Sequence, residues 1–245
     1  DTSGCLLVAK RRAALRDLHL QLREGQTEKH YLALVCGKWN LGTKRIELAL
    51  DTDERRSGER HVAVRAHGKK SVSTFKPVQF FGNLATLMEV EIDTGKTHQI
   101  RVHAAHAGHP VAGDDKYGNR IFNGIFKDYG LKRMFLHSSS LGFTRPGTRE
   151  PMLASAPLPP ELSAVLDTLT RGKARAPQDE RGKTLKPEGA RGPIVAPRVQ
   201  RPAPVVQTGK PRMGNPRTGG AKSGTPGLVK GSGPVRGEGR RRART

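Results

Sequence analysis

The 245-residue sequence has few aromatic residues, few cysteines and few acidic residues, and each shortage excludes a class of protein. Aromatic residues make up 4% of the chain and hydrophobic residues 34%, which disfavours one large uniform core. Two cysteines are too few for a disulfide framework or a cysteine-based metal knuckle, and they fit a reducing compartment. No apolar run approaches the roughly 18 residues that a membrane-spanning helix needs. The sequence therefore predicts a soluble, cytoplasmic protein without membrane contact.

Basic residues outnumber acidic ones, 44 against 22, and most of this excess lies in one segment. Residues 171–245 contain 19 Lys and Arg against 4 Asp and Glu, with 10 of the 17 prolines, 14 of the 29 glycines and no aromatic residue. Such a segment buries too little apolar surface to offset the entropy of ordering, so we expect a disordered tail. Its cations would bind nucleic-acid phosphates, or the tail would simply be solvated.

Residues 1–170 have the length and patterning of one folded domain. Leucines at helical spacing predict a helix over Ala13–Leu22 that stops at Gly25, and two more helices are expected over Thr97–Ala107 and after Pro159. Strands are expected over the apolar or alternating segments Lys29–Val35, Ile46–Leu50, His61–Ala66, Ser71–Phe75, Leu84–Ile92 and Phe135–Phe143. Neighbouring strands with helices set apart favour an α+β fold with a mixed, mostly antiparallel sheet and flanking helices.

Two short patterns suggest chemistry but carry little weight. Asp93-Thr94-Gly95 matches an aspartic-protease tripeptide, yet such a protease needs a second aspartate in a pair, so a turn is the better interpretation. His98, His103, His106 and His109 lie within twelve residues, and a helix would bring His103 and His106 one turn apart. No cysteine or H-E-x-x-H pattern accompanies them, and the nearby Asp114 and Asp115 lie in a Gly-rich loop. We therefore predict no metal site.

A longer pattern carries a family resemblance. The segment 93–103, D-T-G-K-T-H-Q-I-R-V-H, resembles the T-G-R-T-H-Q-I-R-V-H segment of the RluA-type pseudouridine synthases, with Lys96 in place of arginine. Four more segments match in the same order: D-T-S-G with L-L-V-A-K, E-K-H-Y-L-A-L-V, G-H-P-V-A-G-D running to Y-G, and F-L-H. Together they cover nearly all of residues 1–170. The branch that acts on the large ribosomal subunit is the most similar.

The resemblance implies a pseudouridine synthase fold and activity. These enzymes break the glycosidic C–N bond of a uridine in RNA, turn the uracil and form a C–C bond, without a metal or cofactor. The base must leave its stack to be reached. Tyr31 corresponds to the active-site tyrosine that lies against the flipped uracil, although it could also be a half-buried strand aromatic. Arg101 corresponds to the residue that pairs with the catalytic aspartate and keeps it ionised, or it could contact phosphate from the helix surface.

Further residues receive expected roles in the same way. Leu136 would pack near the pocket or simply belong to the core. The residues expected to contact RNA are Lys29, Lys96, His98, Gln99 and His103. The partner would be large-subunit ribosomal RNA, bound by a monomer.

The catalytic aspartate itself lies outside the matched segments. In the family it belongs to H-R-L-D-R-x-T-S-G, and Asp1 aligns two positions after it. We therefore expect residues 1–170 to be a catalytic domain that lacks its N-terminal part, and the 245-residue chain alone to be inactive. The alternative is a non-catalytic RNA-binding module, in which a basic groove and the tail hold RNA without chemistry.

Overall fold

The computed structural model describes residues 2–54, 60–172, 175–179 and 181–187. Most of the tail expected from the sequence, residues 188–245, lies outside these ranges. The described part nevertheless continues with packed structure past residue 170, because Ala176 is buried and Gln178 forms an isolated β-bridge with Thr184.

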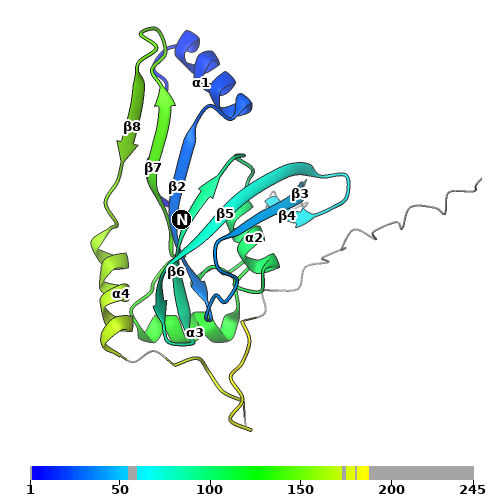
Figure 1. Ribbon diagram of the computed structural model, residues 1–245, viewed down its shortest axis with the longest axis vertical. Helices are drawn as coiled ribbons and strands as arrows, with labels where there is room; N and C mark the ends of the chain where they lie inside the picture. Colours follow the sequence, from blue (N-terminus) through cyan, green and yellow to red (C-terminus); the bar gives the residue numbers. More distant parts are fainter. Residues whose placement is uncertain (1, 55–59, 173–174, 180, 188–245) are drawn as a thin grey trace, which may run out of the picture. The chain divides into compact units, whose positions relative to one another are not determined.

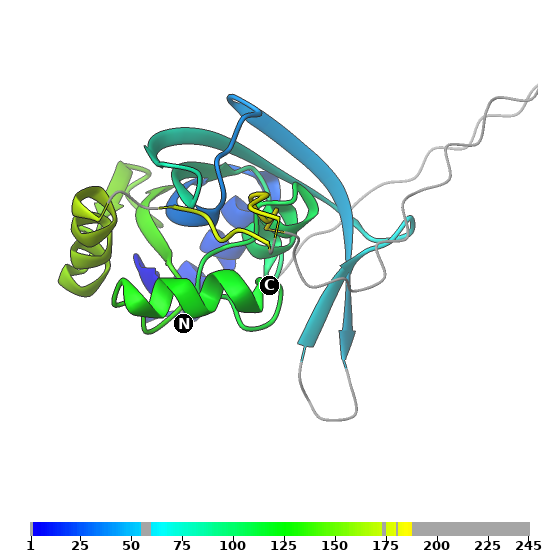
Figure 2. The ribbon, with the colours of Figure 1, turned by 90° about the horizontal axis from the view of Figure 1, so that it is seen from below.

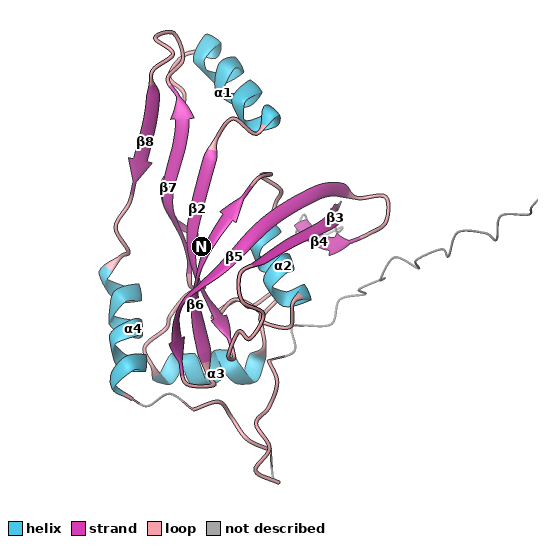
Figure 3. Cartoon of the chain, viewed as in Figure 1, coloured by secondary structure: helices cyan, strands magenta, loops and turns pink. Residues whose placement is uncertain are grey.

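Eight strands and four helices form the described part of the chain (Figure 1; Figure 3). In chain order they are β1 (Ser3–Gly4), α1 (Arg12–Glu24), β2 (Glu28–Cys36), β3 (Lys44–Glu54), β4 (Arg60–Val64), β5 (Lys69–Phe81), β6 (Ala85–Ile92), α2 (Gln99–His106), α3 (Arg120–Asp128), β7 (Leu136–Thr144), β8 (Pro151–Ser155) and α4 (Pro160–Arg171). Every helix and strand expected from the sequence is present. Strands β1 and β8 and helix α3 were not expected. None of the helices in the described ranges is long and apolar enough to cross a bilayer.

All eight strands belong to one sheet in the order β1-β7-β2-β6-β5-β3-β4, with β8 paired to β7. Only the short β1–β7 pairing is parallel among the described strands, and the rest are antiparallel. The expected α+β class with a mixed, mostly antiparallel sheet is therefore confirmed.

Strand β2 lies in the middle of the sheet and is covered on both faces, which explains why its apolar residues do not alternate with polar ones. On one face, Leu34 and Cys36 pack with residues of α3 and α4. On the other face, Ala33 and Val35 pack with Ile100 and others of α2. In Figure 2, which is seen from below relative to Figure 1, α3 is the green helix and α4 the yellow-green one. Tyr31 therefore lies on a strand in the middle of the sheet.

A third cluster joins α2 to the far end of the sheet, where β3 pairs with β4. Its buried members are Leu50, Val62, Val64, Val102 and Tyr117. Strands β3 and β4 therefore pack against α2 and against the loop that follows α2. This contact brings Val62 next to Tyr117.

Helix α1 is fixed to β7 by one buried side-chain amide. Gln21 donates from Nε2 to the Thr144 carbonyl oxygen and accepts at Oε1 from the Thr144 N–H, both at 2.8 Å. The helix ends at Gly25, whose φ of 71° is in the left-handed region that glycine adopts without strain. A Cβ at Gly25 would lie 3.9 Å from the Asp93 carbonyl oxygen. The end of α1 therefore lies beside the loop that follows β6.

That loop, residues 93–98, is held by another buried amide, from Gln99. Its Oε1 accepts from the Thr94 hydroxyl at 2.8 Å and from the Lys96 N–H at 3.1 Å. Its Nε2 donates to the Val72 carbonyl oxygen at 2.8 Å. The sequence predicted the helix from Thr97, but α2 begins at Gln99, because His98 has a left-handed φ of 54° that a helix does not allow.

Candidate active site

Arg101, in the first turn of α2, forms a bidentate ion pair with Asp114. Its Nε and Nη2 each lie 2.7 Å from a different carboxylate oxygen. The Asp114 side chain is fully buried and the Arg101 side chain is 16% exposed. Two short charge-assisted bonds in this fork geometry fix the plane of the guanidinium. Within the described ranges Nη1 has no hydrogen-bond partner, so one corner of the guanidinium is available to another group.

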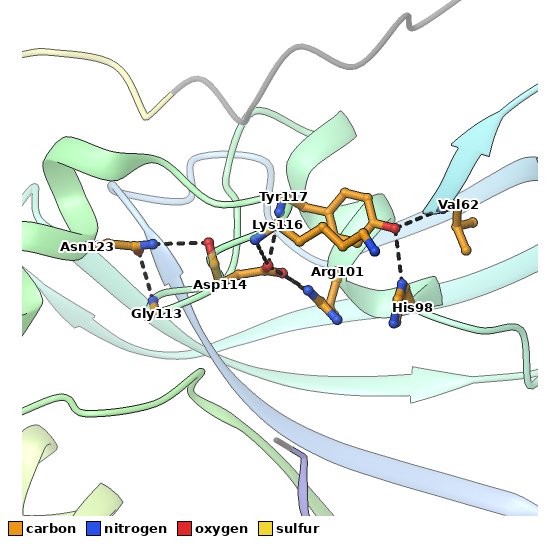
Figure 4. A network of polar contacts seen from close by, with 8 residues as sticks. All are labelled: Val62, His98, Arg101, Gly113, Asp114, Lys116, Tyr117 and Asn123. Atoms are coloured by element: carbon orange, nitrogen blue, oxygen red, sulfur yellow. Dashed lines mark hydrogen bonds and ion pairs between the residues drawn. The ribbon is translucent and has the colours of Figure 1, made fainter. Parts of the chain in front are cut away.

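Asp114 is itself held by the loop between α2 and α3 (Figure 4). Its Oδ1 accepts the backbone N–H groups of Lys116 and Tyr117, each at 2.9 Å. Asn123 of α3 bonds to the same loop, donating to the Asp114 carbonyl oxygen at 3.0 Å and accepting from the Gly113 N–H at 2.9 Å. Both oxygens of the carboxylate accept hydrogen bonds, so Asp114 serves as a rigid support for Arg101.

Gly113 allows the chain to enter this turn. Its φ is 74°, and a Cβ there would come within 2.5 Å of the Arg133 carbonyl oxygen. A larger residue would meet both the wrong backbone region and a clash. The position of Asp114 therefore depends on glycine immediately before it.

Tyr117 packs against the face of the Arg101 guanidinium, whereas Asp114 bonds to its edge. The guanidinium carbon lies 4.9 Å from the Tyr117 ring centroid, which is cation–π geometry. The Tyr117 hydroxyl accepts from the Val62 N–H at 2.9 Å and lies 3.0 Å from Nδ1 of His98. Burial, together with the positive charges of Arg101 and Lys116, lowers the pKa of His98 to about 4. His98 is therefore neutral near pH 7 and adds no charge to the site.

Tyr31 lies on β2, at the position where its pairing with β7 shifts register. It packs against a buried cluster that includes Ile100, the neighbour of Arg101, and Leu136. Burial raises the pKa of Tyr31, while a hydrogen bond to the Ser138 side chain acts in the opposite direction. Its phenol is therefore protonated at neutral pH. The structure thus brings Tyr31 and Leu136 together and places both in the cluster of the helix that carries Arg101.

The residues expected to contact RNA divide into two groups. Lys29, Gln99 and His103 are buried, with 5%, 2% and 0% of their surface exposed. Nζ of Lys29 donates to the carbonyl and hydroxyl oxygens of Thr27, at 3.0 and 2.7 Å. Gln99 holds its loop as described above. The polar groups of these three residues bond to protein groups in this structure, and their expected contact with RNA stays a prediction.

His103 is buried in a polar contact of its own. Its Nε2 lies 2.8 Å from the Ser71 hydroxyl, which donates to the Leu48 carbonyl oxygen at 2.7 Å. Since the hydroxyl has only one proton, Nε2 of His103 is the donor in their contact. The Nδ1 atom is buried without a partner, and burial lowers the pKa of His103 to about 4. His103 is therefore a neutral core residue.

Lys96 and His98 are the two expected contacts that remain partly exposed. His98 belongs to the network around Tyr117, and Lys96 lines a cleft against α1. Within the described ranges, no group of three His, Cys, Asp or Glu side chains could hold a metal ion.

Sequence reasoning missed the two supports of Arg101. From the sequence, Asp114 is an acid near the histidines and, like Tyr117, part of a matched segment, without a role for either. The signal that was available is the spacing of Gly113-Asp114 and Tyr117-Gly118 directly after the helix. A carboxylate at that position can pair with a cation on the preceding helix and can accept hydrogen bonds from the N–H groups of its own loop.

Comparison with known proteins shows what this chain is similar to. Residues 1–106 match the family model described as RNA pseudouridylate synthase. The chain is 48% identical over 173 residues to a Haemophilus ducreyi protein named ribosomal large subunit pseudouridine synthase C, covering 71% of this chain and 54% of that protein. It is 47% identical over 175 residues to the protein of that name from Escherichia coli K12, with the same two shares. The chain thus spans about half the length of the curated relatives it matches.

Solved structures agree on the fold. Human RNA pseudouridylate synthase domain containing 1 superposes with a TM-score of 0.53 at 23% identity, over 74% of this chain and 83% of that one. Human RNA pseudouridylate synthase domain containing 4 superposes with a TM-score of 0.52 at 18% identity, over 69% and 76%. The fold is that of a pseudouridine synthase. Residues 1–106 are an RNA pseudouridylate synthase domain of the RluA type.

Proposed function

We propose that the protein carrying this chain isomerises specific uridines to pseudouridine in large-subunit ribosomal RNA. The family match and the names of the relatives support the reaction and the substrate. The observation that carries the proposal is the guanidinium of Arg101, which Asp114 and Tyr117 hold with one nitrogen left over. The protein would act in the cytoplasm as a monomer.

Arg101 would position the nucleophile. In the resembled family the nucleophile is an aspartate, and we propose that its carboxylate bonds to Nη1 of Arg101. A guanidinium next to a carboxylate favours its ionised, nucleophilic form. Because Asp114 already uses Nε and Nη2, the nucleophile would meet a guanidinium whose plane is set in advance.

Tyr31 would receive the flipped uracil. Its ring is amphipathic and half-buried, and the phenol is protonated at neutral pH because burial raises its pKa. A neutral ring can lie against a neutral base without placing a charge beside it. The buried Leu136, in the same cluster, would close the apolar side of the pocket. The C–N bond then breaks, the base turns, and a C–C bond forms, with no cofactor taking part.

The test uses the protein in its natural length and a large-subunit ribosomal RNA transcript. We expect wild-type protein to form pseudouridine, and Tyr31→Phe and Arg101→Ala to lose most turnover while still binding the RNA. Matched controls are Tyr129→Phe and Arg120→Ala, which change the same residue types at the two ends of α3. Unchanged rates in both site variants would remove their proposed roles. RNA binding without any product from wild-type protein would favour the non-catalytic module.

A further inference from the structure

A basic cleft lies between α1 and the loop after β6, apart from the network around Arg101. It has a volume of about 650 Å³, within the range of clefts that bind ligands. Its lining residues are Arg16, His19, Leu22, Arg23, Asp93, Thr94, Gly95 and Lys96. The residues of α1 contribute one wall and residues 93–96 the other.

The charges in the basic cleft are mainly positive and unpaired. Arg16, His19 and Arg23 follow the helical spacing of three and four residues, so they form one stripe on α1, and all three are exposed. Among the described residues, no carboxylate lies within ion-pair distance of Arg16, Arg23 or Lys96. Asp93, the one acid among the described residues of the lining, is already bonded to Arg45 at 2.8 Å. The cleft therefore presents cations that can bind an anionic ligand.

Both walls of the basic cleft are held in place by the buried amides described above. Gln21 fixes α1 to Thr144, and Gln99 fixes the Thr94–Lys96 turn. The cations thus extend from rigid backbone, so less ordering entropy is lost when they bind a ligand. The wall formed by residues 93–96 continues directly into α2, where Arg101 follows Lys96 by five residues.

We propose that the basic cleft binds the sugar–phosphate backbone of single-stranded RNA beside the reacting uridine, through Arg16, Arg23 and Lys96. The inference rests on the proposed function for the identity of the polymer. The chemistry comes from the lining, since Arg16, Arg23 and Lys96 are cations that bind phosphate, and none of the described residues that line the cleft is Phe, Tyr or Trp. Contacts to phosphate alone position a strand without reading its sequence.

The experiment compares two pairs of arginine or lysine substitutions in the full-length protein. Arg16→Gln/Arg23→Gln removes two cleft charges that lie seven residues apart on α1. Arg120→Gln/Lys127→Gln is the matched control, because it removes two exposed charges with the same spacing on α3. The probe is a single-stranded RNA fragment of large-subunit ribosomal RNA, with Kd measured across a salt series and kcat and KM measured for pseudouridine formation.

We expect the cleft variant to bind about tenfold more weakly, and its salt dependence to flatten by a slope of about 1 to 1.5, since two phosphate contacts are lost. The loss should be equal for RNA fragments of different sequence, and KM should rise by more than kcat falls. The control should stay within about twofold of wild type.

Equal affinity and equal salt slope in the cleft variant and wild type would overturn the proposal, as would an equal loss in the control. A loss confined to one RNA sequence would also overturn it, because the cleft would then read bases. If wild-type protein binds RNA but forms no pseudouridine, the proposed function fails, while the binding series still decides the cleft.

Discussion

Arginines in two regions of the molecule have opposite surroundings. Arg101 is largely enclosed, with two bonds of 2.7 Å to a buried carboxylate and an aromatic ring beneath it. Arg16 and Arg23 are exposed on α1 and have no acidic partner among the described residues. An enclosed and paired guanidinium has a fixed direction, whereas an exposed cation is free to follow a flexible polyanion. The first arrangement suits the positioning of a reacting group and the second suits the holding of a strand.

The buried ion pair between Arg101 and Asp114 has a role other than stability. Removing two charges from water costs free energy that the pair repays only when its geometry is good, so such a pair is weak evidence for stability. Asp114 instead gains two backbone N–H bonds and sets the plane of Arg101. We infer that the pair is selected for direction, and this makes it the more sensitive of the two regions to mutation.

The largest effect is expected from Asp114→Asn. The amide leaves the Arg101 charge uncompensated and cannot reproduce both bonds, so we expect the free energy of unfolding to fall by about 3 kcal/mol. Where the protein stays folded, kcat should fall by about 100-fold, because a misplaced positioning group has costs of that order. The measurements are denaturant unfolding and pseudouridine formation at a temperature where the variant is folded.

The neighbouring aspartate provides the control for this change. Asp115→Asn alters the same functional group at an exposed position one residue further on. It should leave both unfolding and turnover near wild type. Equal losses in the two variants would show that the loop, and not the Arg101 pair, is what matters.

A smaller effect concerns acid stability through His103, which is neutral in the folded protein. Its pKa is about 4 when folded and about 6.5 in the unfolded chain, so the unfolded chain binds the proton first as pH falls. Stability from this group is therefore complete above pH 6.5 and is lost between about 6.5 and 4. Between pH 7 and 5 the loss amounts to about 2 kcal/mol.

The His103→Gln variant should flatten this part of the pH dependence of unfolding. His19→Gln is the matched control, because His19 is exposed on another helix, α1. Denaturant unfolding at several pH values measures both. If the curve of His103→Gln fell as steeply with acid as that of wild type, His103 would not be the neutral core residue described above.

The sequence predicts the part of the fold that depends on apolar spacing. Helix α1 stops at Gly25 as expected, and β2 lies between two covered faces as its unbroken apolar run indicated. Strand β8 could not be found this way, because its residues are mostly exposed and do not alternate. Helix α3 did carry a signal, since Asn119 caps it by accepting from the N–H groups of Ile121 and Phe122.

The candidate site was predictable only in part. The motif that contains Arg101 identified the residue, but its partner within the domain depends on a turn at Gly113 that brings Asp114 back to the helix. The polar residues of the segment 93–103 differ in burial, and therefore in what they contact. Gln99 and His103 lie on one face of the helix and bond to β5, while Arg101 projects from another face toward Asp114, because a helix turns successive side chains by about 100°.

The most direct test of the central claim is a map of pseudouridines in large-subunit ribosomal RNA from cells that lack the gene. We predict that specific pseudouridines disappear, that the wild-type gene restores them, and that a gene with Arg101→Ala does not. A map identical to that of wild-type cells would contradict the proposed function. Full restoration by Arg101→Ala would contradict the role of the guanidinium that Asp114 and Tyr117 hold.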